Sequence, residues 1–140
     1  MEHQRKIDSA FWVLRLGLGA TAFLAGADKF TNLLTDWGKY VAPEAREKLP
    51  VSKKNFMRAV GLIEMLVGIG ILSPHTRLSS YAAGGWLLTI AANLYLNEDY
   101  DVAVRDVNMA LAAFALAQLS AAREEEVAEE ELVDHRLGAA

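Results

Sequence analysis

Long apolar stretches alternate with short charged segments along this 140-residue chain. Each of the four stretches carries at most one charged side chain, Arg15 in the first and Glu64 in the second. The apolar positions lack the period-two alternation of a barrel strand and are rich in Ala, Leu and Gly. The pattern therefore predicts helices and an all-α fold. The four stretches are residues 9–27, 59–73, 78–96 and 107–122.

The lengths of these stretches are those of membrane spans. A helix needs about 20 residues to cross a hydrocarbon core, and the shorter stretches reach this if Arg58 and Arg105 extend their charged ends to the headgroups. We predict an integral membrane four-helix bundle as one domain over residues 1–123. The acidic tail, residues 124–140, is expected to be either a solvated helix extension or disordered. The predicted spans are about 9–28, 56–73, 78–97 and 103–122.

Two other interpretations fit the pattern less well. A water-soluble four-helix bundle needs a polar face on every helix, yet residues 84–96 offer only Thr89 and Asn93 as polar side chains. A cleaved signal peptide ending near residue 27 would have Arg15 in the middle of its apolar core. The apolar core of a signal peptide does not normally contain a charged residue. Four spans is the better count.

The segment between the first two spans, residues 28–56, has a helical pattern of its own. Its apolar and aromatic side chains recur at roughly helical spacing, and a run rich in Lys and Arg follows them. Trp and Tyr favour the headgroup level of a bilayer, so the pattern predicts an amphipathic helix lying in the interface. These side chains are Phe30, Leu33, Leu34, Trp37, Tyr40 and Val41.

Composition excludes several kinds of chemistry. The chain has no cysteine, which removes disulfides, thiolate nucleophiles and Cys-ligated metals. Its three histidines lie at span ends or in the tails, and no nucleotide-binding or zinc-protease motif is present. The formal net charge of −4 comes largely from the tail, and no basic patch indicates nucleic acid. We expect no metal site, no intrinsic cofactor and no catalytic residue.

Small residues recur at four-residue spacing in the first and fourth spans, where lipid gives helices no hydrophobic reason to associate. Gly17, Thr21 and Ala25 share one face of the first span. Close packing within the chain is a better explanation of these faces than a dedicated dimer interface.

Polar side chains gather in the half of the bundle that faces the first loop. Glu64 lies roughly 12 Å from that side at 1.5 Å per residue. Ionisable groups inside a span are costly and need a reason. Two explanations stay open: a polar binding pocket with the interfacial helix as its lid, or a structural network in which Glu64 pairs with Arg15 or Arg105. The gathered residues are Asp28, Glu64, Asn93, Asn97, Asp101, Arg105, Asp106 and Asn108.

A series of short motifs runs through residues 10–123 in a defined order. After Arg15 the motifs are Gly26-Ala27-Asp28-Lys29-Phe30, Asp36-Trp37, Tyr40-Val41-Ala42-Pro43, Phe56-Met57, Gly61-Leu62-Ile63-Glu64, Pro74-His75-Thr76-Arg77, Trp86-Leu87, Asn93-Leu94 and Tyr100-Asp101-Val102-Ala103-Val104-Arg105-Asp106. Together they resemble an uncharacterised subgroup of the DoxX-like small membrane proteins. The resemblance implies a four-span bundle in the bacterial cytoplasmic membrane. Some relatives are partners of the redox subunit in membrane complexes, including quinone-reducing ones that oxidise thiosulfate.

Charge and resemblance imply opposite membrane orientations. An even number of spans puts both termini on one side, and that side carries fewer Lys and Arg than the side of the first loop. The positive-inside rule then favours termini outside, whereas the resemblance implies cytoplasmic termini. We prefer the second orientation, because cations in an interfacial helix bias topology less cleanly than cations in a plain loop.

The preferred functional hypothesis is a non-catalytic accessory subunit of a membrane complex, with quinone-linked redox complexes as the example that the resemblance supplies. The alternative is a small-molecule, lipid or quinone-binding protein or carrier, which predicts a cavity beside Glu64. An enzyme in its own right ranks last, because no nucleophile, metal cluster or cofactor motif supports one. The expected partners are membrane lipid and either other membrane subunits or further copies of this chain.

Overall fold

The computed structural model describes residues 2–48 and 50–138, and within them it contains helices and no strand. The predicted all-α fold is therefore confirmed. The elements are α1 (Glu2–Thr31), the 3₁₀ helix η1 (Trp37–Tyr40), α2 (Pro43–Lys48), α3 (Lys53–Leu72), α4 (Thr76–Leu96) and α5 (Tyr100–Gly138).

Short polar residues set several helix ends. Ser52 begins α3, because its hydroxyl accepts a hydrogen bond from the backbone N–H three residues on, at 3.3 Å. Asp36 begins η1, because its carboxylate accepts a hydrogen bond from the backbone N–H two residues on, at 3.0 Å. Asn32 and Glu98, just beyond α1 and α4, have left-handed φ angles of 52° and 63°, a conformation that ends helices.

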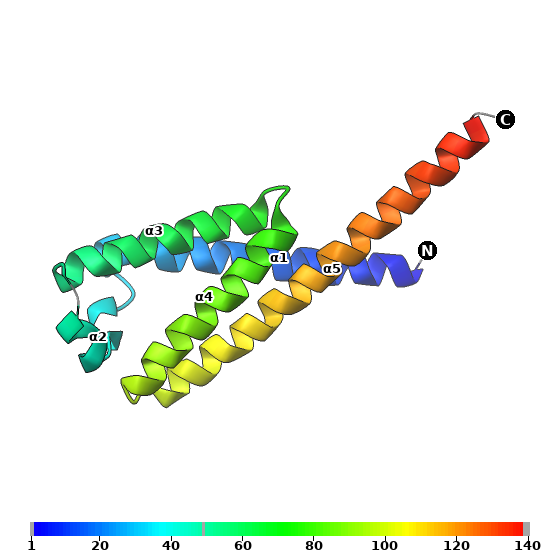
Figure 1. The fold of residues 1–140 in the computed structure, drawn as a ribbon. Helices are drawn as coiled ribbons and strands as arrows, with labels where there is room; N and C mark the ends of the chain where they lie inside the picture. The colour runs from blue at the N-terminus through cyan, green and yellow to red at the C-terminus, as the bar shows by residue number, and fades with distance from the viewer. Residues whose placement is uncertain (1, 49, 139–140) are drawn as a thin grey trace.

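The four long helices form two antiparallel pairs, α1 with α3 and α4 with α5 (Figure 1). The pairs meet near the α3–α4 turn and diverge toward the opposite end, where η1 and α2 lie (Figure 1). The hydrophobic core includes Phe11, Ile71 and Leu116 and therefore occupies the closed end. In this V-shaped arrangement the helix pairs are farthest apart at the first-loop end (Figure 1).

Two glycine pairs bring α1 and α3 into backbone contact. A Cβ at Gly61 would lie 2.5 Å from the carbonyl oxygen of Gly26, and a Cβ at Gly68 would lie 2.7 Å from that of Gly19. Only glycine leaves room for such an approach. The two contacts are seven residues apart on both helices, so they fix one register of α1 against α3.

Charged side chains join the helices at the closed end of the bundle. Arg123 of α5 forms an ion pair with Asp8 of α1, and its guanidinium carbon lies 4.5 Å from the ring centroid of Phe11. Arg77 of α4 lies 3.3 Å from Glu124 of α5. These pairs mark the point at which α5 leaves the bundle.

Within the described chain, three helices are long and apolar enough to cross a membrane: Arg5–Thr31, Lys53–Leu72 and Tyr100–Gly138. The third predicted span is occupied by α4, which has 21 residues but is not among the three. Its serines, Thr89 and Asn93 lower its mean hydropathy. The four-span bundle therefore stays a prediction.

The first loop and the tail differ in how well they were anticipated. The predicted amphipathic helix between the first two spans is wrong in form, because η1 and the six-residue α2 take its place, separated by Val41 and Ala42. Of the two alternatives for the tail, the structure shows the helix extension: α5 continues without a break to Gly138.

Candidate functional site

A cavity of ≈ 690 Å³ lies between the two helix pairs. All four long helices and η1 contribute to its lining, which is mostly apolar and includes the rings of Trp37, Tyr40, Phe56 and Trp86. Its charged lining residues are Lys29 and Glu64 on one wall and Arg105 and Asp106 on the other. An apolar pocket of this size with a few polar groups is the usual form of a small-molecule site.

A buried ion pair forms the first wall. Lys29 Nζ lies 2.5 Å from Glu64 Oε2, and the two side chains are only 4% and 11% exposed. The ammonium group also lies 3.5 Å from the carbonyl oxygen of Ala25 and 3.7 Å from the ring centroid of Trp37. Each buried charge thus has a partner, which it needs in order to remain charged away from water.

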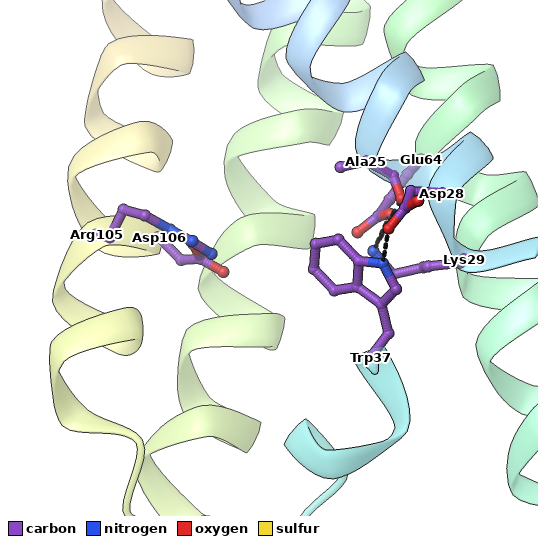
Figure 2. A network of polar contacts seen from close by, with 7 residues as sticks. All are labelled: Ala25, Asp28, Lys29, Trp37, Glu64, Arg105 and Asp106. Atoms are coloured by element: carbon purple, nitrogen blue, oxygen red, sulfur yellow. Dashed lines mark hydrogen bonds and ion pairs between the residues drawn. The ribbon is translucent and has the colours of Figure 1, made fainter. Parts of the chain in front are cut away.

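Asp28, at the end of α1, organises the segment that leads to η1. Its carboxylate accepts hydrogen bonds from the indole N–H of Trp37 at 2.7 Å and from the backbone N–H groups of Leu33 and Leu34 at 2.9 Å and 3.1 Å. Figure 2 shows the indole beside Asp28 and Lys29, on the side toward Arg105 and Asp106. Asp28 therefore positions the aromatic ring that covers the ion pair.

Asn93 of α4 anchors η1 from the other helix pair. Its side-chain oxygen accepts a hydrogen bond from the N–H of Ala42 at 3.1 Å, and its amide nitrogen donates to the carbonyl oxygen of Tyr40 at 2.6 Å. Asn97, one turn further on, donates to the carbonyl oxygen of Lys39 at 3.1 Å. The two asparagines thus tie η1 across the open end of the V.

Replacing Asn93 with leucine is expected to release η1 without unfolding the bundle. The amide hydrogen of Ala42 loses its acceptor, so its exchange with solvent should become at least about tenfold faster. Hydrogen exchange followed by mass spectrometry measures this. Asn108→Leu, a change at an exposed asparagine of α5, is the matched control. Equal exchange in the two variants would show that Asn93 does not hold η1.

A second pair of charges lies across the cavity (Figure 2). Arg105 donates from Nε and Nη2 to Asp106 Oδ1, at 2.9 Å and 2.8 Å. The Asp106 side chain is 6% exposed, whereas that of Arg105 is 58% exposed. The aspartate therefore faces inward, and the guanidinium lies at the edge of the cavity.

The structure brings together most of the polar residues that the sequence singled out. Glu64, Asn93, Arg105 and Asp106 line the cavity, while Asp28 and Asn97 hold η1 in place. Asp101 and Asn108 are exposed on α5 and do not line the cavity.

The expected ion pair between Arg15 and Glu64 is wrong. Glu64 pairs with Lys29, and Arg15 lies near the closed end, where it donates to the carbonyl oxygens of Ile71, Leu72 and Ser73 at 3.0, 2.8 and 2.8 Å. The end of α3 leaves these carbonyls without helical partners, and a cation there also favours the helix dipole. Arg15 is therefore a cap for α3.

Arg15→Met should lower the free energy of unfolding by about 1.5–3 kcal/mol, the usual contribution of hydrogen bonds to a charged group. Unfolding in mixed detergent micelles, followed by circular dichroism, measures the loss. Arg5→Met, at an exposed position of α1, is the control. An equal, small loss in both variants would contradict the capping role.

Two residues of the site were not singled out from the sequence, Lys29 and Trp37. Lys29 looked like a loop residue, because α1 was expected to end at residue 28, whereas it continues to Thr31. Trp37 was assigned to the headgroup level of the interfacial helix, not to the site. Trp86 also lines the cavity, and its buried indole N–H has no acceptor among the described residues.

Within the part of the chain described, no group of three or more His, Cys, Asp or Glu side chains is placed to hold a metal ion.

Comparison with known proteins found no matching family model, no matching curated protein and no matching solved structure.

Proposed function

We propose that this chain is an integral membrane protein that binds an apolar small molecule, of the lipid or quinone class, between its two helix pairs. The observation that carries the proposal is the ≈ 690 Å³ cavity beside Glu64, which has the size and mostly apolar lining of a ligand pocket. The charges around it are paired with one another, so none of them needs a ligand to balance it.

The outer surface of the bundle supports the membrane part of the proposal. Large apolar side chains are exposed on every long helix, among them Leu16, Leu66, Leu88 and Leu111. A soluble monomer seldom exposes so many large apolar side chains on every helix. We take α4 as the fourth span, since residues 78–96 contain no charge. We propose the bacterial cytoplasmic membrane as the location of the protein, because its motifs resemble those of DoxX-like proteins.

Filling the cavity tests the proposal directly. Ala22 lines the cavity, so Ala22→Trp should exclude the ligand, whereas Ala20→Trp places the same side chain on the exposed face of α1. Each protein is purified from native membranes in mild detergent, and bound small molecules are extracted and identified by mass spectrometry. A molecule present in stoichiometric amount in the unmodified protein and Ala20→Trp, and lost from Ala22→Trp, is the expected result. Equal amounts in all three would contradict the proposal.

An accessory subunit of a membrane complex is a second candidate, favoured by the helical tail. Beyond Arg123, α5 extends past the bundle (Figure 1) and exposes Val127, Leu132, Val133 and Leu137 along an acidic helix. Such a helix offers a partner protein both apolar and charged contacts. If this is correct, subunits that co-purify with the full chain should be lost when residues 124–140 are deleted. Purification of the full chain without any partner would remove this candidate.

A further inference from the structure

Among the described residues, the interior of the cavity has no unpaired cation that could bind a charged ligand. Its one deeply buried cation, Lys29, is 4% exposed and already pairs with Glu64. Breaking such a pair to bind an ionic group inside would leave an uncompensated charge away from water. The interior therefore suits an apolar chain, and any charged group of the ligand must lie at the edge.

Arg105 is the cavity-lining cation at that edge. Its side chain is 58% exposed, and two of its nitrogens donate to Asp106. A guanidinium has five N–H donors, and Nη1 of Arg105 has no protein partner among the residues described. This planar group remains able to bind a carboxylate or a phosphate, whose geometry it matches.

One segment beside this edge, from η1 to the first turns of α3, is basic. Residues 39–58 contain six Lys or Arg against two Glu, although the whole chain has a net charge of −4. Lys39 Nζ lies 4.7 Å from the ring centroid of Tyr40, which lines the cavity. Lys53 packs on η1, since a Cβ at Gly38 would lie 2.6 Å from its Cε. A cluster of cations beside a cavity attracts anions to its mouth.

From these observations we infer that the ligand is an anionic amphiphile, with its apolar chain in the cavity and its negatively charged head group on Arg105. This inference rests on the proposed function and narrows it, because a neutral lipid or a quinone has no charge for Arg105 to bind. The shared chemistry is an anionic head on an apolar chain, whether the head is the carboxylate of a free fatty acid or the phosphate of a phospholipid.

Tryptophan fluorescence can test the inference. The chain has three tryptophans, and Trp12→Phe leaves Trp37 and Trp86, both of which line the cavity. Bromine quenches indole fluorescence on contact, so the full-length variant in detergent is titrated with dibrominated stearic acid and with its uncharged methyl ester. We expect the acid to quench at about tenfold lower concentration than the ester, as a charge-assisted contact provides.

Variants locate the head group. In the Trp12→Phe background, Arg105→Gln should remove the preference for the acid, whereas Arg58→Gln, at an exposed arginine outside the lining, should retain it. Equal quenching by acid and ester in the parent variant, together with equal quenching by the two phospholipids of the titration described next, overturns the inference but leaves a cavity that binds apolar molecules. No quenching by either probe overturns the proposed function as well.

A second titration distinguishes the two sources of the head group. The same variant in lipid nanodiscs receives dibrominated phosphatidylglycerol or dibrominated phosphatidylcholine. Stronger quenching by the anionic phospholipid, lost in Arg105→Gln, assigns a phosphate head. Preference for the free acid in detergent without preference between these phospholipids assigns a carboxylate head. Absence of any charge preference in both experiments contradicts the inference.

Discussion

Alanine at both Gly61 and Gly68 is expected to lower the free energy of unfolding by about 2–6 kcal/mol, because each added methyl group overpacks a close helix contact at about 1–3 kcal/mol. The clash at each position is with backbone atoms of α1, at 2.5 Å and 2.7 Å, so rotation of a side chain cannot relieve it. The two sites are about 10 Å apart along α3, so their effects should nearly add. Unfolding titrations in mixed micelles, followed by circular dichroism, give the free energies.

The chain supplies matched controls for this experiment. A Cβ at Gly17 or Gly85 would meet nothing within 4 Å, and both glycines lie inside helices. The expected packing at Gly17 is therefore wrong, since Gly19 and Gly26 make the close contacts of α1 instead. Alanine there should leave stability unchanged or raise it by up to about 1 kcal/mol, because alanine is the better helix former. If all four substitutions behaved alike, α1 and α3 would not be in backbone contact.

Replacing Lys29 with methionine is expected to cost about 3–5 kcal/mol, because it leaves the carboxylate of Glu64 buried without its partner. Adding Glu64→Leu should restore most of the loss, since an apolar pair of similar size is often as stable as a buried ion pair. The double-mutant cycle measures the coupling between the two side chains. The same titration used for the glycines supplies the free energies.

Lys6 provides the comparison for Lys29. Its Nζ lies 3.0 Å from Oε1 of Glu2 on the surface of α1, where the two side chains are 74% and 79% exposed. Lys6→Met should therefore cost less than about 1 kcal/mol. A loss of similar size at positions 6 and 29, or no recovery in the double variant, would show that the buried pair contributes nothing specific.

The grouping of Glu64, Asn93, Arg105 and Asp106 could be predicted because depth along a helix follows directly from residue number. The rotation of each helix about its own axis, and therefore the partner of each polar side chain, could not be predicted. Lys29 reaches Glu64 because Gly26 and Gly61 hold α1 close to α3, and a single sequence does not show which glycines face each other. The same reason explains Arg15, whose partners are backbone carbonyls more than 50 residues away along the chain.

The first loop was misread because its apolar spacing resembles a helix while its hydrogen bonds are tertiary. Asp28 binds Trp37 and Asn93 binds both sides of Val41, so contacts with α1 and α4 outweigh the helical pattern. Local propensity is a weak guide where a short segment can satisfy its backbone on neighbouring helices. Pro43, at the start of α2, adds a break that favours two short pieces over one helix.

The unbroken α5 also has a mechanical consequence. Asp106 and Gly138 lie on opposite sides of the ion pair between Arg123 and Asp8, at about 25 Å and about 22 Å along the helix. Because α5 packs on α4, the two helices would turn together about that point, as a lever with nearly equal arms. A ligand that pushed the cavity end of α5 outward by about 2 Å would move the tip of the tail by about 2 Å in the opposite direction. Occupancy of the cavity would thus be transmitted to a surface well outside the bundle.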